Sequence, residues 1–275
     1  MALSILDVYQ RVLPKTNCGD CGYPSCLAFA GMVVSEGVPL DKCPHLDPET
    51  LAWAQKELDE QHAAGKWTRK DTAADALEWA RERAASMRIS DLPERIGGRL
   101  DGEGEEQILE LPYFQDTLRI SADGVKKAGG GDLTRWEEVF IYNHMAQGGS
   151  REPTGVWKGL VELPNTVSKV KSMRSHVEEP LIRCFQGRAE ELFKAGEALG
   201  GEDLTGKGFE ADVALLFRPL PRIPVVLLFW DHDPEEGYEA RVKLLFDETI
   251  VEHLDTESIM FLSERIRQLL CRDED

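Results

Sequence analysis

Four of the six cysteines in this chain lie within its first 43 residues, and their spacing constrains the fold more than any other feature of the sequence. The pattern is Cys18-x2-Cys21-x4-Cys26-x16-Cys43, with Pro44 directly after the last cysteine. Three of these thiols come from one short loop, which two intervening glycines allow to bend tightly. Such a spacing, closed by a Cys-Pro dipeptide, is typical of a 4Fe-4S cubane, because the cubane needs four converging thiolates. We therefore predict that these four cysteines ligate a 4Fe-4S cluster.

Two other uses of the same thiols stay open. A zinc site with four cysteines usually has two short C-x2–4-C pairs with a longer spacer between them, whereas only Cys18 and Cys21 form such a pair here. The second alternative is a set of thiols without any metal. Cys184 and Cys271 stand alone later in the chain. In a reducing compartment we expect them to stay unpaired, Cys184 as a small core residue and Cys271 as a bystander thiol, with a redox role for Cys271 as the lesser alternative.

Charge and hydropathy exclude several classes of protein. The net charge of −18 repels phosphate backbones, so nucleic acid is not an expected partner. No apolar run approaches the ~20 residues of a membrane-spanning helix, and the first residues lack the basic and apolar stretches of a secretory signal. We therefore expect a cytoplasmic protein without a membrane span. The common hydrolase and nicotinamide-binding motifs are absent, and whether the chain is an enzyme stays open.

The sequence divides into three segments. Residues 1–47 form the cysteine module, in which Pro14 ends a first short helix and Gly37 caps a second helix that follows Cys26. Residues 48–90 are polar and helical in pattern and are expected to form a connector. In residues 91–275 the strand patterns come in pairs with helices grouped between them. We therefore predict an α+β fold, with a small helical cluster module followed by a domain whose sheet is mostly antiparallel.

The last segment contains strand and helix patterns at definite positions. An acidic, glycine-rich tract over 101–106 is expected to be an exposed loop. The expected strands cover residues 106–112, 116–121, 156–163, 209–217, 224–230 and 239–246. The expected helices cover residues 133–146, 177–199 and 256–271.

The segment NCGDCGYPSCLAFA from Asn17 to Ala30, together with Gly37 and Cys43-Pro44, carries a resemblance to known proteins. It is similar to the 4Fe-4S module of the large subunit of corrinoid iron-sulfur proteins and of Rnf-type B subunits. The likeness covers residues 3–47 and implies a low-potential cluster, held by the four cysteines, in the cytoplasm of an anaerobe. Corrinoid proteins of this kind continue with a (β/α)8 barrel, which the order of elements here does not predict.

The rest of the chain has a resemblance of its own. The segments TGVWKG at 154–159, LGG at 199–201, PLPRIPV at 219–225 and LLFD at 244–247 look like an uncharacterised domain family that is often fused behind this cluster module. That family implies no activity for the residues concerned.

A weaker candidate site lies in the loop Asp231–Glu236, directly after the apolar strand expected over 224–230. Asp231, His232 and Asp233 could bind a metal there, or the same residues could form a solvated turn. His232 could also ligate the metal of a tetrapyrrole or corrinoid.

Other polar and aromatic side chains of residues 91–275 point less specifically to a function. Each of the histidines at positions 144, 176 and 253 is expected to be a surface residue or a satisfied core residue without a functional partner. Four aromatic residues are expected in the core but would suit a large flat cofactor if they lined one cavity. These residues are Trp136, Tyr142, Trp157 and Trp230.

Three functional hypotheses follow. The first is a low-potential electron-transfer protein, whose cluster accepts an electron from a ferredoxin-like donor and delivers it to a redox partner protein or to a cofactor held by residues 91–275. The second is that residues 91–275 bind a corrinoid (cobalamin) or another tetrapyrrole that the cluster keeps reduced. The third is a metal-dependent enzyme that uses the loop Asp231–Glu236. A net charge of −18 opposes the addition of an electron, which favours a low potential, although residues 1–47 are only slightly acidic.

Overall fold

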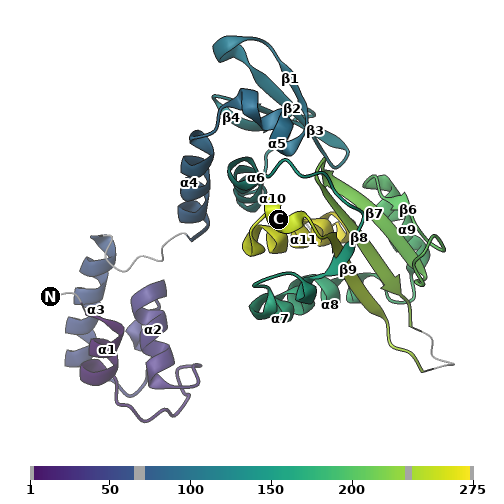
Figure 1. The fold of residues 1–275 in the computed structure, drawn as a ribbon. Coiled ribbons are helices and arrows are strands. Elements are labelled where there is room, and N and C mark those ends of the chain that lie inside the picture. The colour runs from purple at the N-terminus through teal and green to yellow at the C-terminus, as the bar shows by residue number, and fades with distance from the viewer. Residues whose placement is uncertain (1–2, 65–71, 233–236, 273–275) are drawn as a thin grey trace. The chain divides into compact units, whose positions relative to one another are not determined.

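The computed structural model describes residues 3–64, 72–232 and 237–272, and its contacts separate two compact units, Met1–Thr72 and Ala73–Asp275 (Figure 1). Each unit has an apolar core of its own. The sequence predicts three domains with boundaries near residues 47 and 90, and this division stays a prediction. No described helix is both long enough and apolar enough to cross a lipid bilayer.

The first unit is helical. Its elements are α1 (Ile5–Asp7), the π-helical segment η1 (Val8–Val12), α2 (Cys26–Glu36), the 3₁₀ turn η2 (Leu40–Lys42) and α3 (Pro48–Ala63). Gly37 ends α2 in the left-handed conformation at φ 66°, as predicted. Leu58 of α3 packs in one core with Val8 and Phe29, so α3 supports the cysteine segment. Gln61 of α3 also accepts a hydrogen bond from the Leu3 N–H at 2.6 Å and donates one to the Leu3 carbonyl at 3.0 Å.

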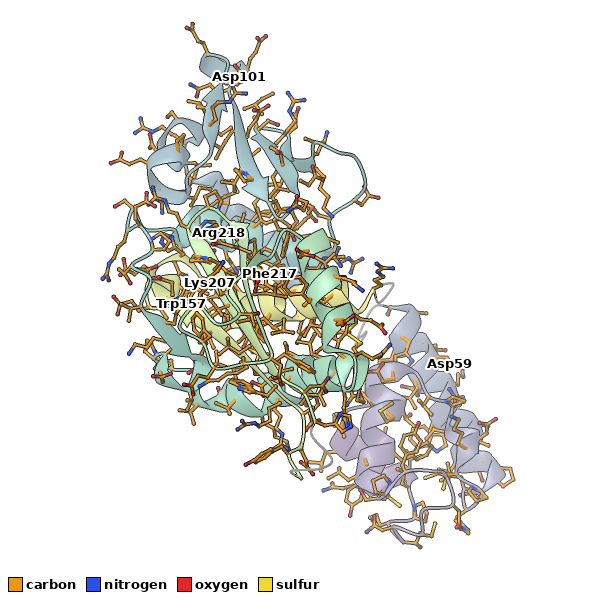
Figure 2. All side chains as sticks on the ribbon, turned by 90° about the vertical axis from the view of Figure 1, so that its right-hand side faces the viewer. Asp59, Asp101, Trp157, Lys207, Phe217 and Arg218 are labelled. Carbon is orange, nitrogen blue, oxygen red and sulfur yellow. A yellow bond between two sulfur atoms is a disulfide. The ribbon has the colours of Figure 1, made fainter. Side chains whose placement is uncertain are left out.

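The second unit begins with helices and a four-stranded sheet. The helices are α4 (Thr72–Ala85), η3 (Ile89–Asp91) and α5 (Leu92–Ile96). The strands, in their spatial order, are β1 (Arg99–Asp101), β2 (Ile108–Tyr113), β3 (Asp116–Ser121) and β4 (Gly124–Lys127), and each pairs antiparallel with its neighbour. Asp101 lies at the far tip of this sheet, where the exposed acidic tract forms the turn η4 (Gly104–Glu106) (Figure 2).

A second antiparallel sheet of five strands follows in the order β5-β9-β8-β7-β6. Its strands are β5 (Trp157–Gly159), β6 (Glu202–Asp203), β7 (Val213–Leu220), β8 (Ile223–Trp230) and β9 (Arg241–Asp247). Strands β7 and β8 are buried at nearly every position, and only Arg218 in β7 is exposed, beside the buried Phe217 (Figure 2). The Phe114 N–H donates a hydrogen bond to the Pro219 carbonyl at 3.1 Å and so ties the loop after β2 to β7.

Helices cover one face of this five-stranded sheet (Figure 1). Leu215 and Phe217 of β7 point into the main core together with Leu192 of α9, whereas Leu216 and its neighbours form a smaller cluster on the opposite face. The remaining elements are α6 (Arg135–Gln147), η5 (Leu160–Glu162), η6 (Val167–Lys169), α7 (Val170–Met173), η7 (Arg174–Glu178), α8 (Glu179–Phe185), α9 (Ala189–Ala198), α10 (Ile250–His253) and α11 (Thr256–Cys271).

The predicted α+β class with antiparallel sheets is confirmed. The prediction of a single helix over 177–199 is wrong. The helix is interrupted between α8 and α9 at Gly187, which has φ 73°. A left-handed residue cannot continue a right-handed helix. The short strands β1, β4 and β6 were not predicted, since a strand of two to four residues carries too little alternation to register as a pattern.

Candidate metal centre

The four predicted ligands come from two segments of the first unit. Cys18 and Cys21 lie in the loop before α2, Cys26 is the first residue of α2, and Cys43 directly follows η2. The loop turns tightly because Gly19 and Gly22 adopt φ 82° and 85°, values that residues with a side chain rarely adopt. The α2 helix and the turn after it then return the chain to this loop with the fourth thiol.

Cys43 lies close enough to the other three thiols for their charges to act on it. Burial raises the pKa of the Cys43 thiol, and the neighbouring charges of Cys21, Cys26 and Cys18 raise it further, against a backbone hydrogen bond at His45 that lowers it. Each of the four is a free thiol. Their exposure is graded, with Cys26 and Cys43 buried, Cys21 half-buried and Cys18 exposed.

The start of α2 fixes the position of Cys26. The Cys26 N–H donates to Asn17 Oδ1 at 2.8 Å, and the Asn17 N–H donates to Cys26 Sγ at 3.4 Å. Ser25 caps the helix by accepting a hydrogen bond from the Ala28 N–H at 3.1 Å. Cys26 therefore lies at the positive end of the α2 helix dipole, where a bound group of negative charge is stabilised.

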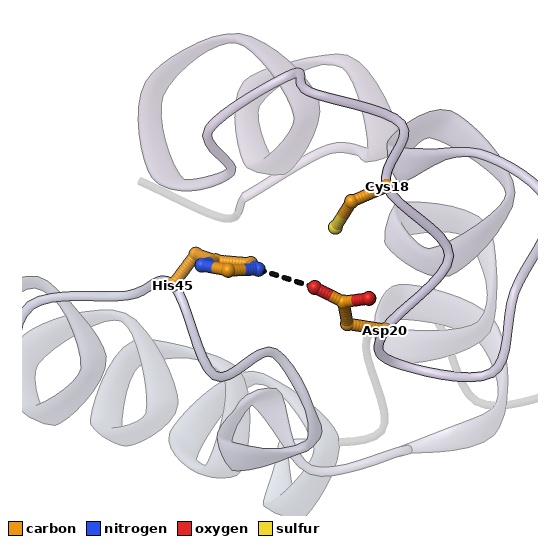
Figure 3. A group of neighbouring side chains, drawn as sticks. All are labelled: Cys18, Asp20 and His45. Atoms are coloured by element: carbon orange, nitrogen blue, oxygen red, sulfur yellow. Dashed lines mark hydrogen bonds and ion pairs between the residues drawn. The ribbon is translucent and has the colours of Figure 1, made fainter.

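Two polar residues lie beside Cys18, and sequence reasoning did not single them out (Figure 3). His45 Nε2 and Asp20 Oδ2 are 2.6 Å apart, and a ligand atom from each lies within 4.8 Å of the Cys18 sulfur. Hydrogen bonds with the His45 ring and with Cys18 lower the pKa of the Asp20 carboxyl. The pair joins the two cysteine-bearing segments at their exposed corner. The histidine directly after the Cys43-Pro44 dipeptide was the available signal.

The donor set fits a thiolate-bound metal group. Four free thiols lie on two segments of one small unit, an N–H group points at one of their sulfurs, and positive-φ glycines leave room around the loop. Both an iron–sulfur cubane and a zinc ion accept four cysteine thiolates. The hydrogen bond to sulfur and the uneven spacing favour the cubane, whose sulfur ligands commonly accept such bonds.

The second candidate site is the loop Asp231–Glu236. In its described part, Asp231 binds backbone N–H groups of the chain itself. Asp231 Oδ1 accepts hydrogen bonds from the Gly187 N–H at 2.7 Å and from the His232 N–H at 2.8 Å. Burial tends to raise the pKa of Asp231, but these backbone hydrogen bonds hold it below its ordinary value. The carboxylate therefore secures the break between α8 and α9. Asp233 and the rest of the loop to Glu236 lie outside the described residues.

The four aromatic residues do not surround one cavity. Tyr142 is buried in the main core, and Trp136 stacks on Phe261 with ring centroids 4.4 Å apart and stays partly exposed. Trp157 and Trp230 pack against the small cluster on the other face of the five-stranded sheet. A shared pocket for a flat cofactor is therefore not formed by this set.

The prediction that Cys184 and Cys271 are unpaired is wrong. They form a disulfide in the structure, with their Cα atoms 6.1 Å apart. Eighty-seven positions separate them in sequence, and they meet because α8 and α11 pack on the same core. No local pattern in the sequence reveals such a pairing.

His144 and His253 are core residues, one of the two readings expected for each, and they lie beside one another. Their ring centroids are 5.5 Å apart in a buried site. His144 Nδ1 is 3.2 Å from the His253 carbonyl, and His253 Nε2 is 3.0 Å from the Arg151 carbonyl. Burial, and then the neighbouring His253, lowers the pKa of His144 to about 3, so both rings are neutral near pH 7. His176 is exposed beside Glu264.

Residues 88–268, more than half of the chain, match a family described as "Domain of unknown function (DUF3786)". The chain belongs to the DUF3786 family. In this DUF3786 protein, residues 13–45 match a second family, described as "Putative Fe-S cluster". The second match contains all four cysteines of the candidate centre and supports an iron–sulfur cofactor.

The N-terminal part of the DUF3786 protein is homologous to subunits of known complexes. It is 41% identical over 58 residues to acetyl-CoA decarbonylase/synthase complex subunit gamma of Methanocaldococcus jannaschii, covering 21% of this chain and 12% of that subunit. The same subunit of Methanothermobacter thermautotrophicus is 52% identical over 65 residues, covering 21% of this chain and 14% of the subunit. The corrinoid/iron-sulfur protein large subunit of Moorella thermoacetica is 50% identical over 46 residues, covering 17% and 10%.

The matched segment thus spans only about an eighth of the length of these relatives. No solved structure gives a significant match to the chain.

Proposed function

We propose that this protein is a low-potential electron carrier whose 4Fe-4S cluster is bound by Cys18, Cys21, Cys26 and Cys43. The observation that carries the proposal is a set of four free thiols in one helical unit, two on a glycine-bent loop, one at the start of α2 and one directly after η2, with Cys43 near enough to the other three for their charges to act on it. When bound, such a cluster stores and releases one electron at a time. The homology of this segment to iron–sulfur subunits supports the same role.

The chain's own residues would hold and shield the cluster. Cys26 and Cys43 are buried against Phe29 and its neighbours, which keeps water away from one side of the site. The Asn17 N–H donates toward the Cys26 sulfur and stabilises negative charge there. Asp20 and His45 span the exposed side beside Cys18, where a partner protein has access to the site.

A ferredoxin-like donor and a redox partner protein complete this proposal. The relatives with the same module are named as subunits of complexes or as a large subunit, which supports an exchange of electrons with another protein. A corrinoid held by Ala73–Asp275 is the alternative destination of the electron, and it rests on the printed name of one relative. The homologous segment in that relative is the iron–sulfur module itself, so the electron-carrier role is the one that the residues favour.

The decisive experiment uses full-length protein purified without oxygen. Iron and acid-labile sulfide are measured, and the EPR spectrum is recorded after reduction with dithionite. We expect about four irons and four sulfides per chain, together with an S = 1/2 signal, in line with a cubane on four thiolates. Visible bands beyond those of the iron–sulfur chromophore after incubation with cobalamin would identify the corrinoid alternative instead.

Substitutions test the ligand assignment. Cys26→Ala and Cys43→Ala should abolish the 4Fe-4S signal, because each removes a buried ligand, while Cys184→Ala and Cys271→Ala should leave it intact. A colourless protein with one zinc ion, or a signal that disappears with either of the two control variants, would refute the proposal.

A further inference from the structure

The second unit contains a pair of cysteines with the features of a redox site. Cys184 lies in the last turn of α8 and Cys271 is the last residue of α11, and both are only partly buried at the edge of the main core. A structural disulfide is usually shielded, whereas a partly exposed one can be reached by an attacking thiolate. We propose that Cys184 and Cys271 form a reversible dithiol–disulfide switch that a small dithiol reductant reaches through the pocket beside them.

The pocket gives this pair access and a suitable charge. Its volume is about 360 Å³, and both cysteines line it. Arg188, Lys194 and Arg272 contribute three positive charges to its wall, against the one negative charge of Glu191. Arg188 lies 3.4 Å from Glu191 and Lys194 lies 3.8 Å from Glu190, so one positive charge remains in excess here, in a chain with a net charge of −18.

These cations favour the chemistry of exchange. Positive charge near a cysteine stabilises the thiolate, both in the incoming reductant and in the cysteine that leaves. The Arg188 guanidinium is held in place by a hydrogen bond that it donates to the Cys184 carbonyl. Both cysteines lie at the C-terminal ends of helices, where the helix dipole works against a thiolate, so the pocket cations oppose a real local penalty.

A small dithiol reduces the Cys184–Cys271 bond in two exchange steps. One thiolate of the reductant attacks a sulfur of the Cys184–Cys271 bond and forms a mixed disulfide, releasing the other cysteine as a thiolate. The second thiol of the reductant then attacks its own sulfur in the mixed disulfide and releases the remaining cysteine. In total, two electrons and two protons pass to the two cysteines, and the reductant leaves as a disulfide.

Opening the bond would loosen one helix end without unfolding the unit. Leu270 and Phe185, the neighbours of the two cysteines, are buried in the core and keep their packing when the sulfurs separate. The last turn of α11, which ends at Arg272 in the left-handed conformation, loses its covalent tie to α8. The switch therefore acts on this turn, and it does not depend on whether the first unit binds a cluster.

The test uses the full chain with its cluster intact, kept without oxygen. The protein is incubated with millimolar dithiothreitol in native buffer, quenched with acid, alkylated and digested, so that mass spectrometry reads the peptides of Cys184 and Cys271 apart from those of the cluster ligands. We expect the pair to become reduced in the folded protein and to reform after transfer to oxidised glutathione, which accepts the two electrons and leaves as two thiols. Hydrogen exchange in residues 268–271 should quicken on reduction.

Charge variants test the role of the pocket. The double variant Arg188→Gln with Lys194→Gln should slow reduction about three- to tenfold, because it removes two of the cations beside the sulfurs. The control Arg99→Gln with Lys207→Gln removes the same charge outside the pocket and should leave the rate unchanged.

Three results would overturn the proposal. The bond could resist dithiothreitol until guanidinium unfolds the unit, which would make it purely structural. The two thiols could stay free in oxidised glutathione. The pocket and control variants could also react at the same rate, which would rule out the route through the pocket.

Discussion

At the scale of single residues, the second unit is organised around a buried carboxylate. Glu137, only 1% exposed, accepts hydrogen bonds from Tyr113 Oη at 2.6 Å and from Arg265 Nε at 3.0 Å, and Lys127 Nζ lies 3.5 Å away. Burial tends to raise the pKa of Glu137, but Tyr113, the Thr134 N–H and the two cations hold it below its ordinary value. This one side chain joins β2, β4, α6 and α11.

We therefore predict that Glu137→Gln lowers the free energy of unfolding by about 2–4 kcal/mol, because it removes the buried carboxylate that two poorly exposed cations contact. Urea denaturation of the second unit measures the loss. The adjacent Glu138→Gln is the matched control. Glu138 pairs with the half-exposed Arg81, so its loss should cost less than about 1 kcal/mol. Equal effects of the two substitutions would contradict the assigned role of Glu137.

The buried His144 predicts a dependence of stability on pH. Its pKa is lowered to about 3 in the folded protein, against 6.5 for an ordinary histidine. Below pH 6.5 the unfolded chain takes up a proton that the folded chain refuses, so stability is complete above that pH and falls as the pH drops toward 3. The slope reaches about 1.4 kcal/mol per pH unit for one such group.

In His144→Asn, which keeps a donor near the position of Nδ1, the unfolding free energy should fall less steeply between pH 6 and pH 4 than in the wild type. Denaturant titrations at several pH values measure this slope. His176→Asn, at an exposed histidine, should keep the wild-type slope. An unchanged slope in His144→Asn would show that this histidine is protonated in the folded state.

These residues show what a sequence can reveal at this scale. The candidate ligands could be found because they fall within 26 positions and are separated by glycines, so spacing alone carries the chemistry. The partners of Glu137 range from Tyr113 to Arg265, and the two buried histidines are 109 positions apart. Contacts of that range depend on how helices pack, which periodicity does not encode.

At the scale of elements, the break between α8 and α9 is the clearest departure from the predicted pattern. The apolar positions of 177–199 continue with helical spacing across the break, so the pattern predicted one helix. Gly187 ends the first helix at φ 73°, and its N–H donates to Asp231 at the end of β8. The glycine was visible in the sequence, but its distant hydrogen-bond partner was not.

Gly187→Ala should therefore destabilise the second unit by about 1–2 kcal/mol, because a Cβ disfavours the left-handed conformation. Gly31→Ala makes the same change inside α2, where φ is not positive and the new Cβ meets no atom within 4 Å. That variant should leave the first unit unchanged or stabilise it by up to about 1 kcal/mol. Thermal unfolding followed by circular dichroism compares the two, and a stable Gly187→Ala protein would mean that this turn accepts another backbone conformation.

At the scale of the whole molecule, two units with separate cores predict two unfolding transitions. The core of Met1–Thr72 contains Cys26 and Cys43 themselves. A metal cluster bound to these two thiols would therefore stabilise that unit directly. The core of Ala73–Asp275 is larger and contains none of the four candidate ligands.

Calorimetry of the anaerobic wild type and of Cys26→Ala tests this arrangement. The transition of the first unit should fall by about 10 °C or more in the variant, which corresponds to a loss of about 2 kcal/mol in a unit of this size. The transition of the second unit should stay where it is. An equal fall of both transitions would show that the two units unfold as one.

Strand β8, at the centre of the five-stranded sheet, has a practical consequence for handling the protein. From Val225 to Trp230 the chain carries no charge, no glycine and no proline, and in the native fold both faces of this stretch are covered. An unfolded or newly made chain exposes the whole stretch, and uncharged β-formers of this kind pair readily between molecules. Recovery from inclusion bodies should therefore suffer from aggregation that begins at these six residues, and preparations that never pass through denaturant should give the higher yield.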